Sequence, residues 1–374
     1  VPPLRFPEFT KEWEEHALAE YLDFKNGLNP DVKRIGRGLP FISVMDILAD
    51  GTINYDSIRG KVEATEREIE NFSVEKGDIL FQRSSETLED VGRANVYMDN
   101  RTAVYGGFVI RGRKIGDYNP LFFKYLLSTP LARKRTCRMG AGAQHFNIGQ
   151  DGLSKISLCF PLMEEQNKIA RLLSLIDERI ATQNKIIDKL QSLIKGLRVC
   201  CMQRNGSNNV YLSEIAQIYQ PQTISSAELT EDGFLVYGAN GIIGKYKDYN
   251  HKTEQICITC RGNTCGMVNY TKPMSWITGN AMVINTDKYQ DKVYKKYLYH
   301  YLSAYNFNSI ISGSGQPQIV RTPLEKLKIT LPTISEQKQK AMILDKVQDK
   351  IEINHNILNL YILQKQYLLR QMFI

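Results

Sequence analysis

The feature of this 374-residue chain that most constrains its fold is an internal repeat at a spacing of 171 residues. The segment LSKISLCFPLMEEQNKIA, which begins at Leu153, returns as LEKLKITLPTISEQKQKA, which begins at Leu324. Identical residues recur at Leu153 and Leu324, Lys155 and Lys326, Pro161 and Pro332, Glu165 and Glu336, and Gln166 and Gln337. A repeat of this length predicts two copies of one structural unit.

Weaker matches extend the repeat toward the N-terminal side of each copy, with small insertions between them. The matched blocks are EWEEHALAEYL at Glu12 with NVYLSEIAQIY at Asn209, GDILFQRSS at Gly77 with EQICITCRG at Glu254, GFVIRG at Gly107 with NAMVIN at Asn280, and GAGAQ at Gly140 with GSGQ at Gly313. The middles of the two copies, around residues 29–63 and 225–249, barely resemble each other. The two copies are therefore expected to share a scaffold and to differ in the segment that it carries.

Each copy has the same order of predicted structure. Short β-rich runs such as LPFISV, AVYGGFVI and AMVIN alternate with glycine, asparagine and aspartate turn signals, which predicts a mixed α/β domain. A proline and a long proline-free segment follow, which predicts a long helix. We expect an α+β protein with globular domains at residues 1–160 and 206–331 and long helices at residues 161–205 and 332–374.

The two predicted helices carry apolar residues at alternating intervals of four and three. In the first helix these are Ile169, Leu173, Ile176, Ile180, Ile187, Leu190, Ile194 and Leu197. Adding 171 gives a rougher second seam at Lys340, Leu344, Val347, Ile351, Asn354, Leu358, Tyr361, Lys365 and Leu368. Such heptads predict that the two helices pair with each other. The alternative is two surface helices that each pack on their own domain.

Two further features of the helices bear on pairing and partners. Gln183 interrupts the first seam and maps onto Asn354 in the second; a buried amide in a seam typically fixes register. A second apolar set lies off the seam at Ile186, Leu193, Ile357, Leu360, Ile362 and Leu363. This set either docks another protein or packs against the adjacent domains, and both readings stay open.

Composition restricts the class of protein. The 48 basic and 40 acidic residues leave a net charge of +8, which is compatible with a polyanionic partner but does not require one. No apolar stretch approaches the roughly 18 residues needed to span a bilayer, so we expect no membrane association and a cytoplasmic location. Seven irregularly spaced cysteines favour a reducing compartment over a disulfide framework.

The sequence contains no recognisable catalytic constellation. Cys257, Cys260 and Cys265 form a close group, but strand residues three apart point to opposite faces, so we expect buried or loop cysteines and no metal site. The Asp/Asn-Pro-Pro-aromatic motif of adenine methyltransferases and the GxxxxGK[ST] phosphate loop are both missing from the sequence, and the five histidines are scattered. A dispersed nuclease site of carboxylates and a lysine stays open, because such residues converge only in three dimensions.

Taken together, LRFPEFTKEWE, GDILFQRSS, VYGGFVI, GAGAQ and PLMEEQNKIARLLSLID resemble one family over essentially the whole chain. The chain resembles the specificity subunit of a type I restriction-modification system. The resemblance implies two target recognition domains in a pseudo-two-fold arrangement, each reading one half of a split double-stranded DNA site. It also implies that two long antiparallel coiled-coil helices join and space these domains.

The resemblance further implies a non-catalytic subunit that works through partners. Two modification (methyltransferase) subunits would bind S-adenosylmethionine and methylate adenine, and restriction subunits would use ATP and Mg²⁺, with no cofactor in this chain itself. Because the middles of the two copies differ, the DNA site is expected to be bipartite and asymmetric. The rival readings are a protein-binding coiled-coil scaffold and a stand-alone nucleic-acid enzyme.

Candidate DNA contacts follow from residue type, because Lys and Arg suit phosphates whereas Arg, Asn and Gln suit base edges. In the first domain they are Lys33, Arg34, Arg37, Arg83, Arg93 and Gln144. In the second domain they are Lys245, Lys247, Arg261, Asn263, Gln316 and Gln318. A basic run, Arg133, Lys134, Arg135 and Arg138, ends an apparent helix in FFKYLLSTPLARKRT and either lines a DNA cleft or complements the helix dipole.

Overall fold

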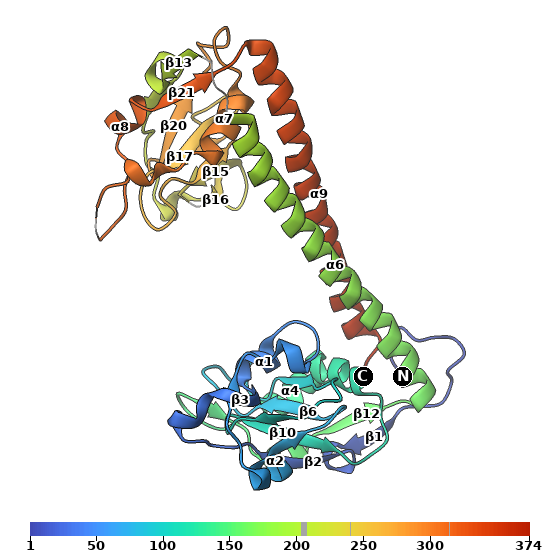
Figure 1. Ribbon diagram of the computed structural model, residues 1–374. Helices are drawn as coiled ribbons and strands as arrows, with labels where there is room; N and C mark the ends of the chain where they lie inside the picture. Colours follow the sequence, from blue (N-terminus) through green and yellow to red (C-terminus); the bar gives the residue numbers. More distant parts are fainter. Residues whose placement is uncertain (203–207, 240, 314) are drawn as a thin grey trace. The chain divides into compact units, whose positions relative to one another are not determined.

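The chain divides into two compact units (Figure 1), as seen in a computed structural model that describes residues 1–202, 208–239, 241–313 and 315–374. Unit 1 comprises Val1–Asn184 and Ile357–Ile374, and unit 2 comprises Lys185–Asn356. The helices α6 (Met163–Met202) and α9 (Ile334–Gln371) each contribute residues to both units. The expected boundary at residues 205 and 206 lies outside the described residues.

Unit 1 contains a four-stranded antiparallel sheet in the order β2-β10-β6-β8. Its strands are β2 (Leu22–Asn26), β10 (Val109–Lys114), β6 (Ile79–Gln82) and β8 (Ala94–Val96). A separate antiparallel pair joins β1 (Glu14–Ala17) to β12 (Ser157–Phe160). All four residues of β6 are buried; Ile79 and Phe81 pack into one apolar cluster, and Leu80 packs into another on the opposite face of the sheet.

Unit 2 repeats this arrangement strand for strand. Its sheet has the order β14-β20-β17-β18, and β13 pairs with β21. The strands are β13 (Asn208–Tyr211), β14 (Gln217–Tyr219), β17 (Ile256–Thr259), β18 (Val268–Tyr270), β20 (Ala281–Asn285) and β21 (Lys328–Leu331). The blocks matched in the sequence form equivalent strands, so the predicted repeat is confirmed.

The divergent middles of the two copies contribute strands to a second sheet in each unit. Unit 1 has the order β4-β3-β9-β5, with β3 (Ile35–Ile42), β4 (Lys61–Val62), β5 (Ser73–Val74) and β9 (Ala103–Tyr105). Unit 2 has the order β16-β15-β19, with β15 (Phe234–Gly238), β16 (Gly241–Tyr246) and β19 (Trp276–Ile277). The parallel pairs β3–β9 and β15–β19 are what these two sheets share.

Shorter helices complete each unit. Unit 1 contains α1 (Val44–Leu48), α2 (Glu66–Phe72), α3 (Pro120–Ser128), α4 (Pro130–Cys137) and α5 (Gln150–Ser154), and unit 2 contains α7 (Lys295–Ala304) and α8 (Arg321–Glu325). The prediction of a single helix over FFKYLLSTPLARKRT is wrong, because the helix is interrupted between α3 and α4. Thr129 precedes Pro130, and its extended backbone (φ −67°, ψ 153°) is the conformation that a following proline favours.

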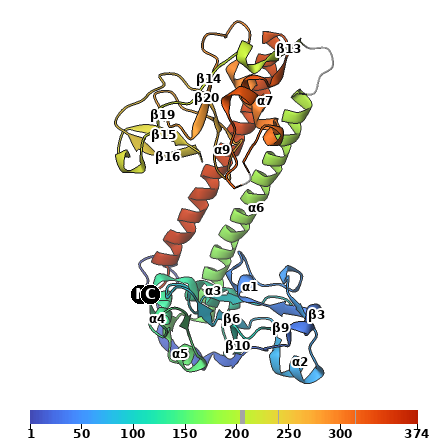
Figure 2. The same cartoon turned by 90° about the vertical axis from the view of Figure 1, so that its left-hand side faces the viewer.

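The end of α9 and the residues that follow it complete the core of unit 1. The Phe373 ring stacks on Phe122 at a centroid distance of 5.4 Å and meets the Trp13 ring edge-on at 6.1 Å. The backbone N–H of Leu4 donates to the carbonyl of Gln371 at 2.9 Å. The two chain ends therefore lie together in unit 1 (Figure 2), which the sequence analysis did not foresee.

The two long helices pack along the predicted seam in each unit, and in each case residue numbers rise along one helix as they fall along the other. In unit 1 the shared core contains Ile169, Leu173 and Ile176 of α6, Leu368 of α9, and Met372, which directly follows α9. In unit 2 it contains Ile194, Leu344 and Ile351, with Leu190, Leu197 and Val347 against them. The predicted antiparallel pairing is confirmed, and the alternative of two separate surface helices is wrong.

The polar positions of the seam are buried as well. Gln183 is 7% exposed in unit 1, and Asn354 is 9% exposed in unit 2. Most of the off-seam set lies at the surface: Ile186, Leu193, Leu360, Ile362 and Leu363 are exposed, and Ile357 is half-buried. These side chains are therefore not used to pack the helices onto the adjacent sheets.

The repeated glutamines tie each long helix to its sheet domain. Gln166 accepts a hydrogen bond from the backbone N–H of Asn119 at 3.0 Å and donates to the carbonyl of Pro161 at 3.0 Å. Gln337 accepts from the backbone N–H of Tyr294 at 2.8 Å and donates to the carbonyls of Lys292 and Pro332. Both side chains are buried, so the identity at these positions reflects a structural joint.

Candidate nucleic-acid interface

Three segments lie side by side at the end of the main sheet of unit 1. The backbone N–H of Arg83, just after β6, donates to the carbonyl of Phe108 at 2.9 Å. The carbonyl of Arg83 accepts from the N–H of Ile148 at 3.0 Å. Beyond Arg83, β7 (Ser84–Ser85) pairs with β11 (Phe146–Asn147). We call this surface, made of residues 83–85, 106–108 and 141–148, the platform of unit 1.

Unit 2 builds the same platform from residues 260–262, 278–280 and the described residues of 312–319. The N–H of Cys260 donates to the carbonyl of Asn280 at 3.1 Å, and the carbonyl of Cys260 accepts from the N–H of Ile319 at 3.0 Å. A further antiparallel bridge joins Arg261 to Gln318. Equivalent backbone hydrogen bonds therefore hold equivalent segments in both units.

The loops of the two platforms lie 171 residues apart in the sequence, which is the spacing of the main repeat. Each loop is closed by a reciprocal pair of backbone hydrogen bonds, between Ala141 and Asn147 in unit 1 and between Ser312 and Gln318 in unit 2. Gly142 (φ +144°) and Gly313 (φ +92°) take the left-handed region where the chain turns back. Counting from these pairs, Gln316 corresponds to His145, so the sequence match of Gln316 with Gln144 is corrected by one position. Position 314 of the matched GSGQ block lies outside the described residues.

Several predicted DNA contacts lie on these platforms or directly beside them. Arg83 is half-buried, and its Nη1 donates to the carbonyl of Gly107 at 3.3 Å. Gln144 and Gln316 are exposed on the loops, and Gln318 is half-buried at the loop end. Arg261 and Asn263 are exposed, and Asn263 directly follows the platform segment 260–262. The structure thus brings together side chains that lie far apart in the sequence.

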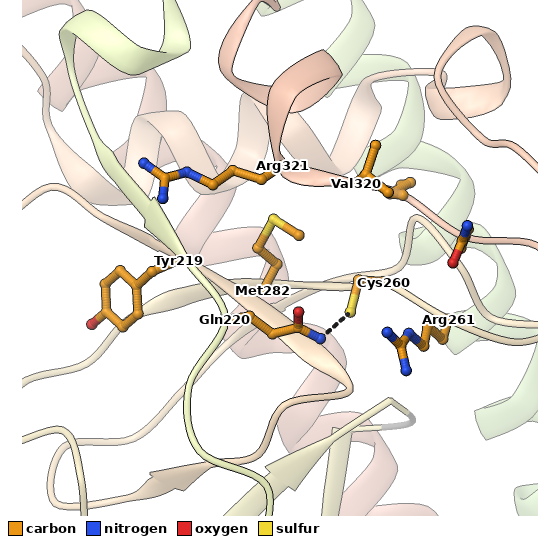
Figure 3. A pocket seen from close by; sticks show the side chains of 9 residues that line it. Tyr219, Gln220, Cys260, Arg261, Met282, Val320 and Arg321 are labelled. Atoms are coloured by element: carbon orange, nitrogen blue, oxygen red, sulfur yellow. Dashed lines mark hydrogen bonds between the residues drawn. The ribbon is translucent and has the colours of Figure 1, made fainter.

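The platform of unit 2 borders a pocket of about 360 Å³ (Figure 3). Arg261 and Arg321 lie on opposite sides of it, and Gln220, Cys260 and Gln318 also line it. The Gln220 amide nitrogen donates to the sulfur of Cys260 at 3.6 Å and to the carbonyl of Gly279. The pocket is therefore rimmed by groups that suit phosphates and base edges.

The candidates at residues 33–37 lie at the start of β3 and differ from one another. Lys33 is exposed. Arg34 pairs with Glu68 and donates to the carbonyl of Glu63, and its guanidinium lowers the pKa of Glu68 to about 2. Arg37 is exposed and pairs with Glu63 at 2.7 Å. Arg34 is therefore a structural residue, whereas Lys33 and Arg37 remain accessible to a ligand.

The other predicted cations are exposed or half-exposed. Arg93 pairs with Asp90 at 2.6 Å, and Lys245 contacts Asp232 at 3.4 Å. Lys247 lies 5.9 Å from the ring centroid of Tyr246. Exposed ion pairs contribute only about 0–1 kcal/mol, so a phosphate could replace these carboxylates at little cost.

Two residues of the basic run, Arg133 and Arg135, make contacts inside unit 1, whereas Lys134 and Arg138 are exposed. Arg133 donates to the carbonyls of Glu89, Val91 and Gly92. Arg135 donates to Glu15 at 2.7 Å and to the carbonyl of Ser157. These two arginines connect α4 to neighbouring segments, so the idea that the whole run lines a DNA cleft is not supported.

The cysteine group is placed as the strand argument predicted. Cys257 lies in the apolar cluster formed with Val283 and Ile277, whereas Cys260 lies in the cluster on the other side of the sheet. Burial raises the pKa of Cys257 to about 12. Over the described residues, no group of three histidine, cysteine or acidic side chains is arranged to hold a metal ion.

Two platform residues were missed by the sequence reasoning. Phe108 and Asn280 sit at the same place in the two platforms, because their carbonyls accept the equivalent hydrogen bonds from Arg83 and Cys260. Phe108 is 70% exposed, and Asn280 is exposed as well. The sequence match of GFVIRG with NAMVIN pairs Gly107 with Asn280, whereas the backbone hydrogen bonds pair Phe108 with Asn280, so this match is corrected by one position.

No helix in the described portions of the chain is long and apolar enough to cross a membrane.

Comparison with known proteins identifies the family. The type I restriction modification DNA specificity domain matches residues 10–192 and 205–360. The type I restriction enzyme MjaVIII specificity subunit of Methanocaldococcus jannaschii is 25% identical over 406 residues, which cover 94% of this chain and 88% of that protein. The EcoprrI specificity subunit of Escherichia coli is 32% identical over 140 residues, which cover 36% of this chain and 34% of that protein.

Solved structures share the fold. The S subunit of a type I restriction-modification system from M. genitalium superimposes with a TM-score of 0.68 at 16% identity, covering 100% of this chain and 99% of that chain. The family match spans both repeated units and extends into both long helices. This chain therefore belongs to the type I restriction-modification DNA specificity family and is a specificity subunit of such a system.

Proposed function

We propose that the chain recognises an asymmetric, bipartite double-stranded DNA site and directs adenine methylation and restriction by partner subunits. The observation that carries the proposal is the repeated platform: equivalent backbone segments in both units present different side chains. Two domains with the same backbone arrangement and different exposed side chains suit a DNA site whose two halves differ in sequence.

The domain assignment that accompanies this proposal follows the repeat. Residues 1–160 and 206–331 are the two target recognition domains, and residues 161–205 and 332–374 are the spacer helices. Gln183 and Asn354, which are buried at seam positions, are proposed to fix the register of the helix pair.

The proposed DNA contacts divide by chemistry. Lys33, Arg37, Arg93, Lys245 and Lys247 are positioned at the surface for phosphates, which carry no sequence information. The platform residues Arg83, Gln144, Arg261, Asn263, Gln316 and Gln318 are proposed to approach base edges. Arg34, which was included in the predicted set, is proposed to hold the segment that presents Lys33 and Arg37.

The partners are proposed to be two modification subunits and the restriction subunits. S-adenosylmethionine, ATP and Mg²⁺ would be bound by those subunits, and the complex would act on DNA in the cytoplasm. The exposed apolar residues of the long helices, including Leu360 and Leu363, are the proposed contact with a modification subunit. Leu360→Ser with Leu363→Ser is expected to reduce co-purification without lowering the melting temperature.

The first experiment is to co-purify the chain with its modification subunit and to map methylated adenines in DNA exposed to the complex. Methylation at one asymmetric bipartite motif that requires both proteins would support the proposal. Complex formation without DNA affinity would favour a scaffold, and methylation by either protein alone would favour a stand-alone enzyme. DNA affinity should also fall steeply with added salt, because phosphate contacts release counterions.

A further inference from the structure

The turn that precedes the central strand of each main sheet is built identically in the two units. In unit 1 the N–H of Val109 donates to the carbonyl of Gly106 at 2.9 Å, and in unit 2 the N–H of Ala281 donates to the carbonyl of Thr278 at 2.9 Å. Phe108 and Asn280 occupy the same position within these turns. An aromatic side chain in one unit thus replaces an amide in the other on the same backbone.

The turn of unit 1 is held firmly by its surroundings. The Arg83 guanidinium donates to the carbonyl of Gly107, and the Arg83 N–H donates to the carbonyl of Phe108. A Cβ atom at Gly107 would collide with the side chain of Asn29, so the chain passes close to that residue. The Phe108 side chain is therefore presented to solvent by a fixed backbone.

Phe108 borders an apolar pocket in unit 1 that is lined also by Ile35, Phe41 and Met45. Phe108, Ile35 and Met45 are 70%, 50% and 75% exposed, which is unusual for large apolar side chains that lie together. Cations accompany this surface: Arg83 contacts the turn, and Lys33 lies in the segment between Pro30 and Ile35, which line the same pocket. An exposed apolar patch by itself also suits a protein partner, and the basic side chains beside this one favour DNA phosphates instead.

Resting on the proposed function, we infer that residues 108 and 280 are matched base-reading positions, one for each half of the DNA site. Phe108 makes an apolar contact with the methyl group of a thymine, which is the apolar feature that a base pair presents in the major groove. Asn280 hydrogen-bonds a base edge, for which adenine offers the bidentate partner. The difference between these two residues contributes to the asymmetry of the site.

The test uses reciprocal substitutions in the full chain, assembled with its modification subunit. Phe108→Asn should change the preference at one position of one half-site by about tenfold and leave the other half unchanged. Asn280→Phe should do the same in the opposite half. Mapping of methylated adenines across genomic DNA measures both effects in the same assay.

A chemical probe separates the methyl contact from other roles of Phe108. In duplexes that carry the motif, deoxyuridine replaces each thymine in turn and removes only its 5-methyl group. One such replacement should weaken binding of the unsubstituted complex several-fold, and Phe108→Asn should abolish the sensitivity to that replacement.

Matched controls come from the same strand. Ile115 follows the other end of β10 and is 61% exposed, so Ile115→Asn adds an amide at a comparably exposed site away from the platform. This variant should leave the motif unchanged. Melting temperatures and co-purification of the variants report separately on folding and assembly.

The outcomes distinguish this inference from the proposed function. A bipartite motif that is the same for the original chain and for Phe108→Asn, or no sensitivity to deoxyuridine in the half-site, would overturn the inference alone. Loss of the modification subunit from Phe108→Asn would also overturn it and assign the patch to a protein contact. Absence of any bipartite motif with the original chain would instead overturn the proposed function.

Discussion

Gln166 and Gln337 illustrate how single residues can be repeated for structural reasons in a DNA-reading protein. Each buried amide satisfies one backbone N–H and at least one carbonyl where the long helix meets the sheet domain. Without the amide, those backbone groups would remain buried and unpaired. The identity of these two positions across the repeat therefore reflects a structural joint between helix and sheet domain.

We predict that Gln337→Leu lowers the free energy of unfolding by about 1–3 kcal/mol, because it leaves the Tyr294 N–H and the Lys292 and Pro332 carbonyls without their partner. The shift is measured by urea unfolding. Gln316→Leu, at an exposed loop position, serves as the control and should change stability by less than about 0.5 kcal/mol. Equal effects of the two variants would contradict the structural role.

Lys33 and Arg34 are neighbours for which the structure predicts opposite phenotypes. Lys33→Ala should weaken DNA binding similarly on all sequences and reduce the slope of log affinity against log salt by about one, because the proposed role of this exposed lysine is to contact a phosphate. The melting temperature should not change. A salt titration of binding by fluorescence anisotropy checks this, and an unchanged slope would remove Lys33 from the interface.

Arg34→Ala should instead reduce stability in a pH-dependent manner. Pairing with Arg34 depresses the folded-state pKa of Glu68 from 4.5 to about 2, so this contribution is present above about pH 4.5 and is lost as the pH falls toward 2. The stability difference between the original chain and Arg34→Ala should therefore shrink on acidification through this window. Urea unfolding at several pH values measures it, and a constant difference would contradict the ion-pair explanation.

At the scale of elements, the helix seam was predictable because it depends on periodicity alone. Every seam position from Ile169 to Leu197 is buried or half-buried, and so is every matching position on α9 from Leu344 to Leu368. Lys365, which departs from the apolar pattern, pairs with Asp177 of α6 at 2.6 Å. The ammonium of Lys365 also lies 5.6 Å from the centroid of the Tyr125 ring. These two contacts explain why a lysine occupies this position of the apolar seam.

We predict that Leu344→Ala costs about 2–5 kcal/mol of stability, because this side chain is fully buried between the helices of unit 2 and its removal leaves a cavity. Ile343, its neighbour on the same helix, is 53% exposed and provides the control. Ile343→Ala should remain within about 0.5 kcal/mol of the original chain. Chemical denaturation measures the free energy of unfolding of both variants and shows whether the buried seam or the exposed helix surface stabilises the helix pair.

Strands of both sheets were predictable, since LPFISV and AVYGGFVI contribute to β3 and β9, but the pairings that form the second sheets were not. Blocks such as GDILFQ and AMVIN are short, apolar and bounded by turn residues, which is enough to predict a buried strand. The parallel pairs β3–β9 and β15–β19 join segments distant in sequence. Such pairings depend on non-local contacts, and a single sequence contains no local signal for them.

At the scale of the whole molecule, the repeat predicts that the two recognition functions are separable. Replacing residues 206–331 by the corresponding segment of another family member should change one half of the methylated motif and leave the other half intact. Mapping of methylated adenines with the chimaera and the modification subunit measures this. A change in both halves would contradict the assignment of one half-site to each domain.

The amino-acid sequence by itself determined the repeat, the order of the repeated strands and the two paired helices, because these depend on spacing, periodicity and residue type along the chain. Only the tertiary structure decided which side chains are engaged in internal contacts and which are exposed on or beside the platforms. Arg34 and Arg133 are engaged in internal contacts, whereas Phe108 and Asn280 emerge at equivalent exposed turns. The physical reason is that a charge or an amide has the same local signature whether it satisfies a neighbouring backbone group or faces solvent, and only the folded chain supplies the neighbour.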